Sequence, residues 1–324
     1  MSTDLRQTTL SSPSFAIPRH FTTTANHPYD LINWEQRTAH IENDKGETVF
    51  HQDNVEFPSF WSQTATNVVA SKYFRGQLGS PNRERSVKEI VDRVADTIGI
   101  WGMEDGYFTP KEGGVFIAEL KHILVNQMGS FNSPVWFNIG CPEVPQQASA
   151  CFLLNVEDSM ESILQWYHDE AIIFKGGSGS GLNVSNLRSK WEPLSGGGKA
   201  SGVLSFMKAA DASAGVIQSG GRVRRAAKMV TLDVDHPEIF DFVWCKALEE
   251  RKARALVTMG YDDAIDGEAY RTVAFQNANH SVNVTDDFLQ KALTSEVFCT
   301  KNRVSYEGQQ HKAEDLLHQI AEAC

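Results

Sequence analysis

The second half of the chain alternates between short β-prone runs and helical patterns, and this alternation limits the possible folds more than any other feature. The β-prone runs that follow residue 148 are SACFLLNV, GLNVSNL, AAKMVTLDV and HSVNVT. Among them lie MESILQWYHDEAIIF and GVLSFMKAADASAGVI, in which apolar residues recur at spacings of three and four. Strands that alternate with helices form a sheet or barrel that the helices cover. The sequence therefore predicts an α/β fold for this part.

The residues before 129 show a different pattern. Residues 1–25 are rich in Ser and Thr, which predicts an unfolded or loosely docked tail. IENDKGETVFHQDNVEF predicts a β-hairpin that turns at Asp44–Gly46. Helical spacing follows in WSQTATNVVASKYF, SVKEIVDRVADTIGIWG and FIAELKHILVNQMG, with Ser86 as an N-cap. We therefore predict a mainly helical domain over residues 26–128 and an α/β domain over residues 129–324.

Composition excludes several classes of protein. The 324 residues are 41% hydrophobic, 22% charged and 10% aromatic, values typical of a globular protein. The net charge of −11 disfavours nonspecific nucleic-acid binding, which needs a net positive surface. No apolar run is long enough for a membrane span, and the first residues lack a signal-peptide pattern. We expect a cytoplasmic protein without direct nucleic-acid or membrane partners.

The five cysteines are odd in number and widely spaced, so structural disulfides are not expected. No C-x-x-C or H-E-x-x-H motif occurs, and no metal site is predicted. Cys151 stands in the apolar run ACFLL. Its thiol is either a small buried hydrophobe or a redox group, and the local sequence does not distinguish the two.

A segment rich in Gly and Ser, KGGSGSGLNVSNLRSKWEPLSGGGK, occupies residues 175–199. Apolar residues interrupt it, which favours a loop held in place over a flexible linker. A P-loop ending at Lys199 would need Gly and a hydroxyl where Pro193 and Ala200 stand. A dinucleotide-binding fingerprint would need Gly at Leu182 or Val184. These spacings disfavour a kinase, an ATPase and a nicotinamide-dependent dehydrogenase.

A second glycine pair lies in SGGRVRRAAK, residues 219–228, beside three arginines. Arginine can bond two phosphate oxygens at once, and glycine lets backbone N–H groups approach an anion. The alternative is a solvated turn whose arginines pair with surface carboxylates. Both interpretations remain open on these residues alone.

Several long motifs in order resemble one family. They are PSFWSQTATN (58–67), FNSPVWFNIG (131–140), ASACFLLNVEDSMESI (148–163), GGSGSGLNVSNLRS (176–189) and SGGRVRRAAKMVTLDVDHPEI (219–239). Together they resemble the catalytic chain of adenosylcobalamin-dependent ribonucleotide reductases, from about residue 27 to the last residue. The resemblance implies a helical N-terminal domain followed by the first half of a ten-stranded α/β barrel.

The resemblance also implies site residues. Cys151 matches a redox-active thiol that helps to reduce the ribose. The implied substrate contacts are Ser133, Ala150, Cys151 and Gly179. The implied contacts to a deoxynucleotide effector are Asp158 and Arg188. The implied specificity loops, over residues 189–199 and 217–226, contain Lys199, Gly220, Gly221, Arg224 and Arg225.

The activity that the resemblance implies is reduction of ribonucleotides to 2′-deoxyribonucleotides by thiyl-radical chemistry, for DNA synthesis and repair. This is an oxidoreductase of the ribonucleoside-diphosphate reductase type, although triphosphate substrates also occur in the family. Adenosylcobalamin is the implied cofactor, with much of its site expected outside this chain. The implied partners are a thioredoxin-like reductant and a second copy of the chain.

The sequence departs from the family pattern in one respect. The radical-bearing cysteine of the family lies in an N-P-C-x-E type motif, which is absent here, and Cys245 and Cys299 lack that context, so we expect both to be structural. AEDLLHQIAEAC predicts a final amphipathic helix without a C-terminal cap. We therefore expect part of a split or truncated enzyme that needs a C-terminal reductase chain. The alternative is a catalytically incomplete nucleotide-binding regulatory module.

Overall fold

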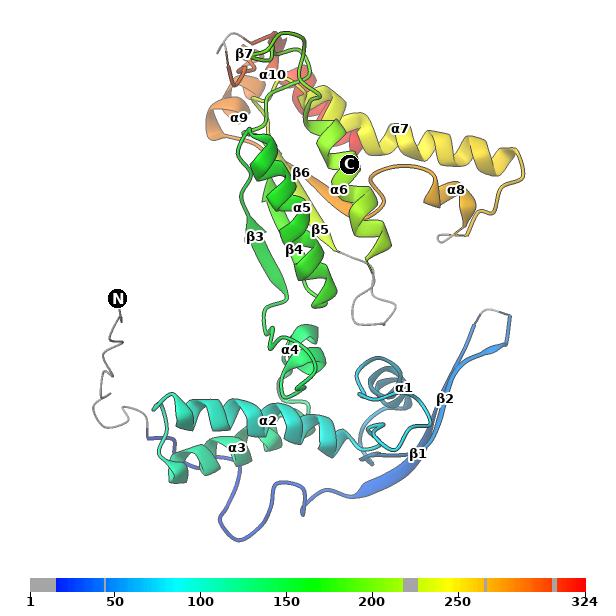
Figure 1. Cartoon of the computed structure of the whole chain (residues 1–324), viewed down its shortest axis with the longest axis vertical. Helices are drawn as coiled ribbons and strands as arrows, with labels where there is room; N and C mark the ends of the chain where they lie inside the picture. The colour runs from blue at the N-terminus through cyan, green and yellow to red at the C-terminus, as the bar shows by residue number, and fades with distance from the viewer. Residues whose placement is uncertain (1–15, 44, 218–226, 265–266, 305–307) are drawn as a thin grey trace. The chain divides into compact units, whose positions relative to one another are not determined.

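The computed structural model describes residues 16–43, 45–217, 227–264, 267–304 and 308–324 (Figure 1). Contacts divide the chain into two compact units, Met1–Ser149 and Ala150–Cys324. Each unit has its own hydrophobic core. This division falls after the expected boundary between residues 128 and 129, and the domain limits themselves remain a prediction.

The N-terminal unit starts with an antiparallel hairpin of β1 (Trp34–Glu42) and β2 (Thr48–Pro58). Gly46 has a φ of +78°, which is the conformation that the predicted turn needs. The predicted hairpin is therefore confirmed, and it extends further toward the N-terminus than its sequence pattern indicates.

The described residues of this unit also form the helices α1 (Gln63–Lys72), α2 (Val87–Glu104), α3 (Pro110–Val125) and α4 (Ser133–Asn138). Ser86 caps α2 as predicted, and Glu89 completes a capping box. A second capping box at Thr109, with Pro110 as the first helical residue, makes α3 begin earlier than predicted.

Part of the predicted tail is described by the structure. The backbone N–H groups of Phe21 and Thr22 each donate to the Glu119 carboxylate of α3, at 2.9 Å. These residues are therefore attached to the N-terminal unit, whereas residues 1–15 lie outside the described part of the chain.

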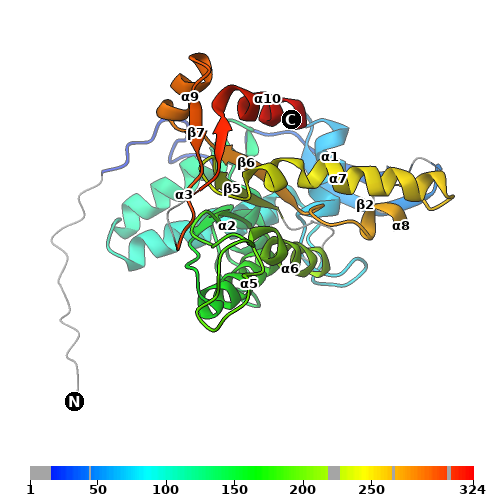
Figure 2. The same cartoon turned by 90° about the horizontal axis from the view of Figure 1, so that it is seen from above.

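The C-terminal unit contains a parallel sheet with the strand order β3-β4-β5-β6. Its strands are β3 (Cys151–Leu154), β4 (Gly179–Asn183), β5 (Lys228–Asp233) and β6 (Ala278–Asn283). The principal connecting helices are α5 (Met160–Lys175), α6 (Val203–Val216) and α7 (Ile239–Thr258). Helices α5 and α6 lie side by side (Figure 2). The predicted α/β fold is confirmed.

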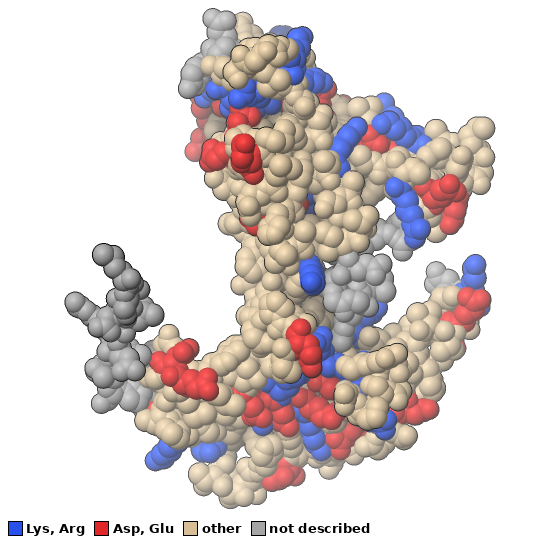
Figure 3. All heavy atoms as spheres, in the orientation of Figure 1, with Lys and Arg blue, Asp and Glu red and all other residues tan. Residues whose placement is uncertain are grey.

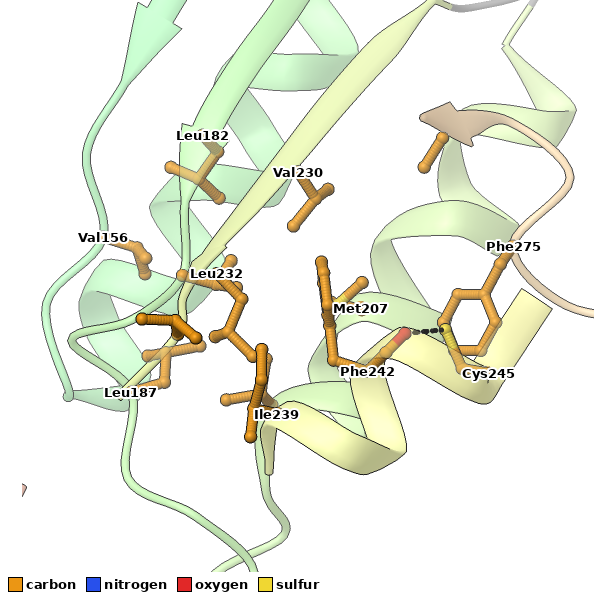
Figure 4. Packing of buried hydrophobic residues seen from close by; sticks show 14 of the residues in the cluster. Val156, Leu182, Leu187, Met207, Val230, Leu232, Ile239, Phe242, Cys245 and Phe275 are labelled. Atoms are coloured by element: carbon orange, nitrogen blue, oxygen red, sulfur yellow. Dashed lines mark hydrogen bonds between the residues drawn. The ribbon is translucent and has the colours of Figure 1, made fainter. Parts of the chain in front are cut away.

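The two faces of this sheet differ. Leu182, Val230 and Leu232 pack against side chains from α6 and α7, in the core that Figure 4 shows. The alternate residues point the other way, because successive side chains of a strand lie on opposite faces. On that second face Cys151 is exposed and Leu153 is 91% exposed. The sheet therefore has one core face and one open face.

The remaining elements are α8 (Glu268–Arg271), α9 (Asp286–Leu293), α10 (Ala313–Ala323) and an antiparallel pair of β7 (Val297–Cys299) and β8 (Gln310–Lys312). The predicted final helix is confirmed by α10, which buries Leu316 in the core. Within the described ranges, no helix has the length and apolar character that a membrane span requires. On the face seen in Figure 3, basic and acidic side chains intermingle and form no continuous basic track.

Candidate functional site

Cys151 and Gly179 lie side by side at the start of two neighbouring strands. They are partners in the register of β3 and β4, and Cys151 is exposed. The backbone N–H of Gly179 donates to the carbonyl oxygen of Ala150 at 2.7 Å. The structure therefore brings together three of the four predicted substrate contacts, Ala150, Cys151 and Gly179.

Residue 179 must be a glycine because the backbone around it leaves no space for a side chain. A Cβ atom there would lie 2.7 Å from the carbonyl oxygen of Ala227 and 3.7 Å from that of Ala150. Backbone from the segments that begin β3 and β5 thus closes around Gly179 from both sides. Part of the predicted loop is in fact strand β4, because glycine lets these three segments of the backbone come close together.

A buried ion pair lies on the core face behind Gly179. Lys228 Nζ is 2.6 Å from Glu170 Oε2, and the two side chains are 1% and 4% exposed. The hydroxyl of Ser180 donates to the other carboxylate oxygen at 2.8 Å, and the ammonium lies 5.3 Å from the ring centre of Trp166. These contacts join α5, β4 and β5. No sequence motif predicts this group, and its one local signal is a lysine within the β-prone run AAKMV.

Asp158 and Arg188, the predicted effector contacts, form an ion pair. Asp158 precedes Ser159, the N-cap of α5, and its Oδ2 lies 2.5 Å from Arg188 Nε. Arg188 Nη1 also donates to the carbonyl oxygen of Pro193 at 3.2 Å. Both side chains remain about a quarter exposed. An anionic ligand could therefore reach the guanidinium from solvent.

The backbone around Arg188 is held by His236 from the DHPEI motif. His236 Nε2 donates to the carbonyl oxygen of Leu187 at 2.8 Å, and its Nδ1 accepts the N–H of Glu238 at 3.0 Å. Burial lowers the pKa of His236 to about 4. The ring is therefore neutral near pH 7, as these two hydrogen bonds require.

Two buried carboxylates fix the rest of this segment. Glu238 accepts the N–H of Val203 at 2.7 Å, and Glu192 accepts the N–H of Ser189 at 2.8 Å. Burial favours a raised pKa for Glu192, yet the hydrogen bonds from backbone N–H groups leave its pKa below the ordinary value. The segment from Leu187 to Val203 is thus anchored at both ends.

The other predicted site residues lie elsewhere. Lys199 is exposed and pairs with Pro193 in a short bridge that Gly197 and Gly198 close with φ near +90°. Ser133 belongs to the N-terminal unit, where it starts α4 and its hydroxyl lies 3.0 Å from that of Tyr73. The specificity-loop residues outside the described part of the chain are Gly220, Gly221, Arg224 and Arg225.

Comparison with protein families identifies both parts of the chain. Residues 149–320 match the ribonucleotide reductase barrel domain, and residues 35–127 match the class II vitamin B12-dependent ribonucleotide reductases. The chain belongs to this class of the ribonucleotide reductase family. The resemblance seen in the sequence motifs is thereby confirmed.

Curated relatives cover nearly all of the chain. The vitamin B12-dependent ribonucleotide reductase of Streptomyces coelicolor is 49% identical over 318 residues, which are 97% of this chain and 33% of the relative. That of Rhodopirellula baltica is 44% identical over 327 residues, or 91% of this chain and 31% of the relative. The chain therefore spans about a third of the length of these reductases.

Proposed function

We propose that the chain belongs to the working part of an adenosylcobalamin-dependent ribonucleotide reductase. It supplies one of the thiols that reduce the substrate, the protein backbone that contacts the substrate, and the effector site. The reaction converts ribonucleotides to 2′-deoxyribonucleotides for DNA synthesis and repair. The observation that carries the proposal is the pairing of an exposed Cys151 with Gly179 on the open face of the sheet. An exposed thiol thus lies directly beside glycine backbone.

Cys151 is proposed to be one of two thiols that reduce the ribose. The C2′–O bond breaks, the hydroxyl leaves as water, and a C2′–H bond takes its place. The two thiols supply two electrons and two hydrogens and end as a disulfide. A thioredoxin-like reductant then restores both thiols. The second thiol and the radical-bearing cysteine belong to the C-terminal part of the reductase, in the same polypeptide or in a complementing chain.

Backbone near Gly179 is proposed to contact the ribose and phosphate. Gly179 and Gly181 leave the open face of β4 without side chains next to Cys151. Gly179 is buried and Gly181 is half-buried, so a ligand beside Cys151 would approach the main chain at Gly181. This arrangement explains why a glycine-rich segment is packed as a strand.

Asp158 and Arg188 are proposed to bind a deoxynucleotide effector. Arginine suits its phosphates because the planar guanidinium can bond two oxygens, and the carboxylate can accept from a ribose hydroxyl or the base. His236 and Glu238 hold the backbone beside them. Effector binding at this pair would act on the adjoining specificity loop over residues 189–199.

Adenosylcobalamin, the proposed cofactor, supplies the radical when it is bound. We propose that most cofactor contacts come from the C-terminal part of the reductase.

The chain is also proposed to pair with a second copy of itself. Met160, Leu164 and Ile172 are exposed on α5 at spacings that place them on one face of the helix. An apolar stripe of this kind fits a helix-to-helix contact.

A cytoplasmic location is proposed from the odd number and wide spacing of the cysteines.

Substitution of Cys151 tests the proposal. The reductase, complete with its C-terminal part and adenosylcobalamin, is assayed for deoxynucleotide formation with a chemical dithiol and with a thioredoxin-like reductant. We expect Cys151→Ser to reduce turnover to background with either reductant. Cys299→Ser, at another exposed cysteine, serves as the matched control and is expected to keep turnover. Persisting turnover in Cys151→Ser would favour the regulatory module instead.

A further inference from the structure

The β1–β2 hairpin of the N-terminal unit, drawn in Figure 1, carries two histidines at opposite positions of its strands. His40 and His51 are register partners, and their Nδ1 atoms lie 3.3 Å apart. The ring planes meet at 77°, so the rings are not stacked. The two Nδ1 atoms thus lie close together on one face of the hairpin.

The Nε2 atom of each ring lies within hydrogen-bond distance of a carboxylate. His40 Nε2 lies 2.9 Å from Glu42 Oε1, and His51 Nε2 lies 3.0 Å from Asp53 Oδ2. Thr38 donates to the Asp53 carboxylate as well, at 2.6 Å. A carboxylate accepts hydrogen bonds, so each Nε2 carries the proton.

This assignment leaves the two Nδ1 atoms without protons. A neutral imidazole has one N–H, so both Nδ1 atoms are then acceptors, and they lie 3.3 Å apart. Two acceptors at this distance repel unless a positive charge lies between them. The pair therefore needs either one extra proton or one metal cation.

The geometry matches a tetrahedral zinc ion. Two Zn–N bonds of about 2.05 Å at a tetrahedral angle place the nitrogens about 3.3 Å apart. Octahedral geometry at about 2.1 Å would bring neighbouring nitrogens to about 3.0 Å. Histidines that bind zinc also commonly donate their second N–H to a carboxylate, as both histidines do here.

The backbone of the site is fixed before any ion binds. Asn67 of α1 accepts the N–H of His40 at 3.2 Å and donates to its carbonyl oxygen at 2.8 Å. Both imidazoles remain accessible, with side chains 37% and 49% exposed. Within the described part of the chain no cluster of three or more His, Cys, Asp or Glu side chains could hold a metal. Water would therefore supply the remaining ligands.

We propose that His40 and His51 form a zinc-binding site on the hairpin, with Glu42 and Asp53 orienting the two rings. The site is independent of the reductase chemistry proposed for Cys151. It takes a free divalent zinc ion through two imidazole nitrogens. With two protein ligands, it is an exchangeable site for zinc.

Calorimetric titration of the full chain with zinc chloride at pH 7.5 tests this site. The exposed thiols are first blocked with iodoacetamide, because thiolates would compete for zinc. We expect one zinc ion per chain, and at least about tenfold weaker binding in His40→Gln and in His51→Gln, each of which loses one of two ligands. His168→Gln is the matched control, because His168 lies 3.2 Å from a carboxylate but is no part of this pair. It is expected to bind zinc like the parent chain.

A structural measurement complements the titration. Chain labelled with ¹⁵N-histidine should show, on addition of zinc, changes at the Nδ1 resonances of two histidines that vanish in the His40→Gln variant. The same spectra show whether each variant is folded. Equal zinc affinity in the parent chain and both variants, with no Nδ1 response, would overturn the proposal and leave a shared proton between the rings.

Discussion

Replacing Lys228 by Met removes one partner of the buried ion pair behind Gly179. The ammonium and the Glu170 carboxylate are 2.6 Å apart and almost fully buried. Met retains much of the apolar volume of Lys but leaves a carboxylate charge without a counter-charge. Removing one partner of a buried pair typically costs about 3–5 kcal/mol. We expect a loss of this size in the stability of the C-terminal unit.

A second substitution separates lost charge from lost packing. In Lys228→Met with Glu170→Leu, neither charge remains, and apolar replacements for a buried pair are often neutral or stabilising. Ser180 would then lose the acceptor for its hydroxyl, which costs about 1–3 kcal/mol. The double variant should therefore recover a large part of the loss, though not all of it.

Hydrogen exchange measures the loss of stability in the C-terminal unit itself. Urea-dependent exchange of peptides from β4 and β5 gives the free energy of opening of the C-terminal unit, separately from the N-terminal unit. Trp166, next to the ammonium, gives an additional fluorescence signal. A loss below about 1 kcal/mol in Lys228→Met, or a double variant as unstable as the single, would refute this account of the pair.

Two further predictions concern the same unit. The pKa of His236 is about 4 when folded, below its ordinary value of 6.5. The unfolded chain therefore binds this proton first. Between pH 6.5 and about 4 the free energy of unfolding should fall by up to about 1.4 kcal/mol per pH unit, a slope that His236→Gln should reduce in urea midpoints. Gly179→Ala, whose Cβ would meet the Ala227 carbonyl oxygen at 2.7 Å, should destabilise the unit by about 1–3 kcal/mol. Gly196→Ala, where a Cβ has open space, should cost far less, and equal urea midpoints would contradict the steric argument.

Much of the fold is visible in the sequence where local signals are strong. The helix predicted over residues 160–174 is α5 (Met160–Lys175), because apolar periodicity and the Ser159 cap agree. Strand β4 begins at Gly179, ahead of the apolar residues that suggest it, since glycine carries no strand signal of its own. No helix is predicted over Ile239–Thr258, where α7 forms, because its apolar face is interrupted by charged residues.

The site is less predictable because its contacts join distant positions. Family resemblance points to Asp158 and Arg188, which the structure brings into contact, and their proposed role in effector binding stays a prediction. Glu170 and Lys228 are 58 positions apart and meet only when β5 lies beside β4. No short sequence motif predicts the pairing of His40 and His51. Their spacing along the chain is set by the hairpin that brings them together.

The bare surface of β4 has a consequence for selectivity. In the proposed site, the glycine backbone of β4 would lie near the sugar and phosphates that all nucleotides share, but glycine offers no side chain that could tell one base from another. A pocket founded on such a strand would accept several substrates with similar ease. Under the proposed function, discrimination among bases would then have to come from neighbouring segments.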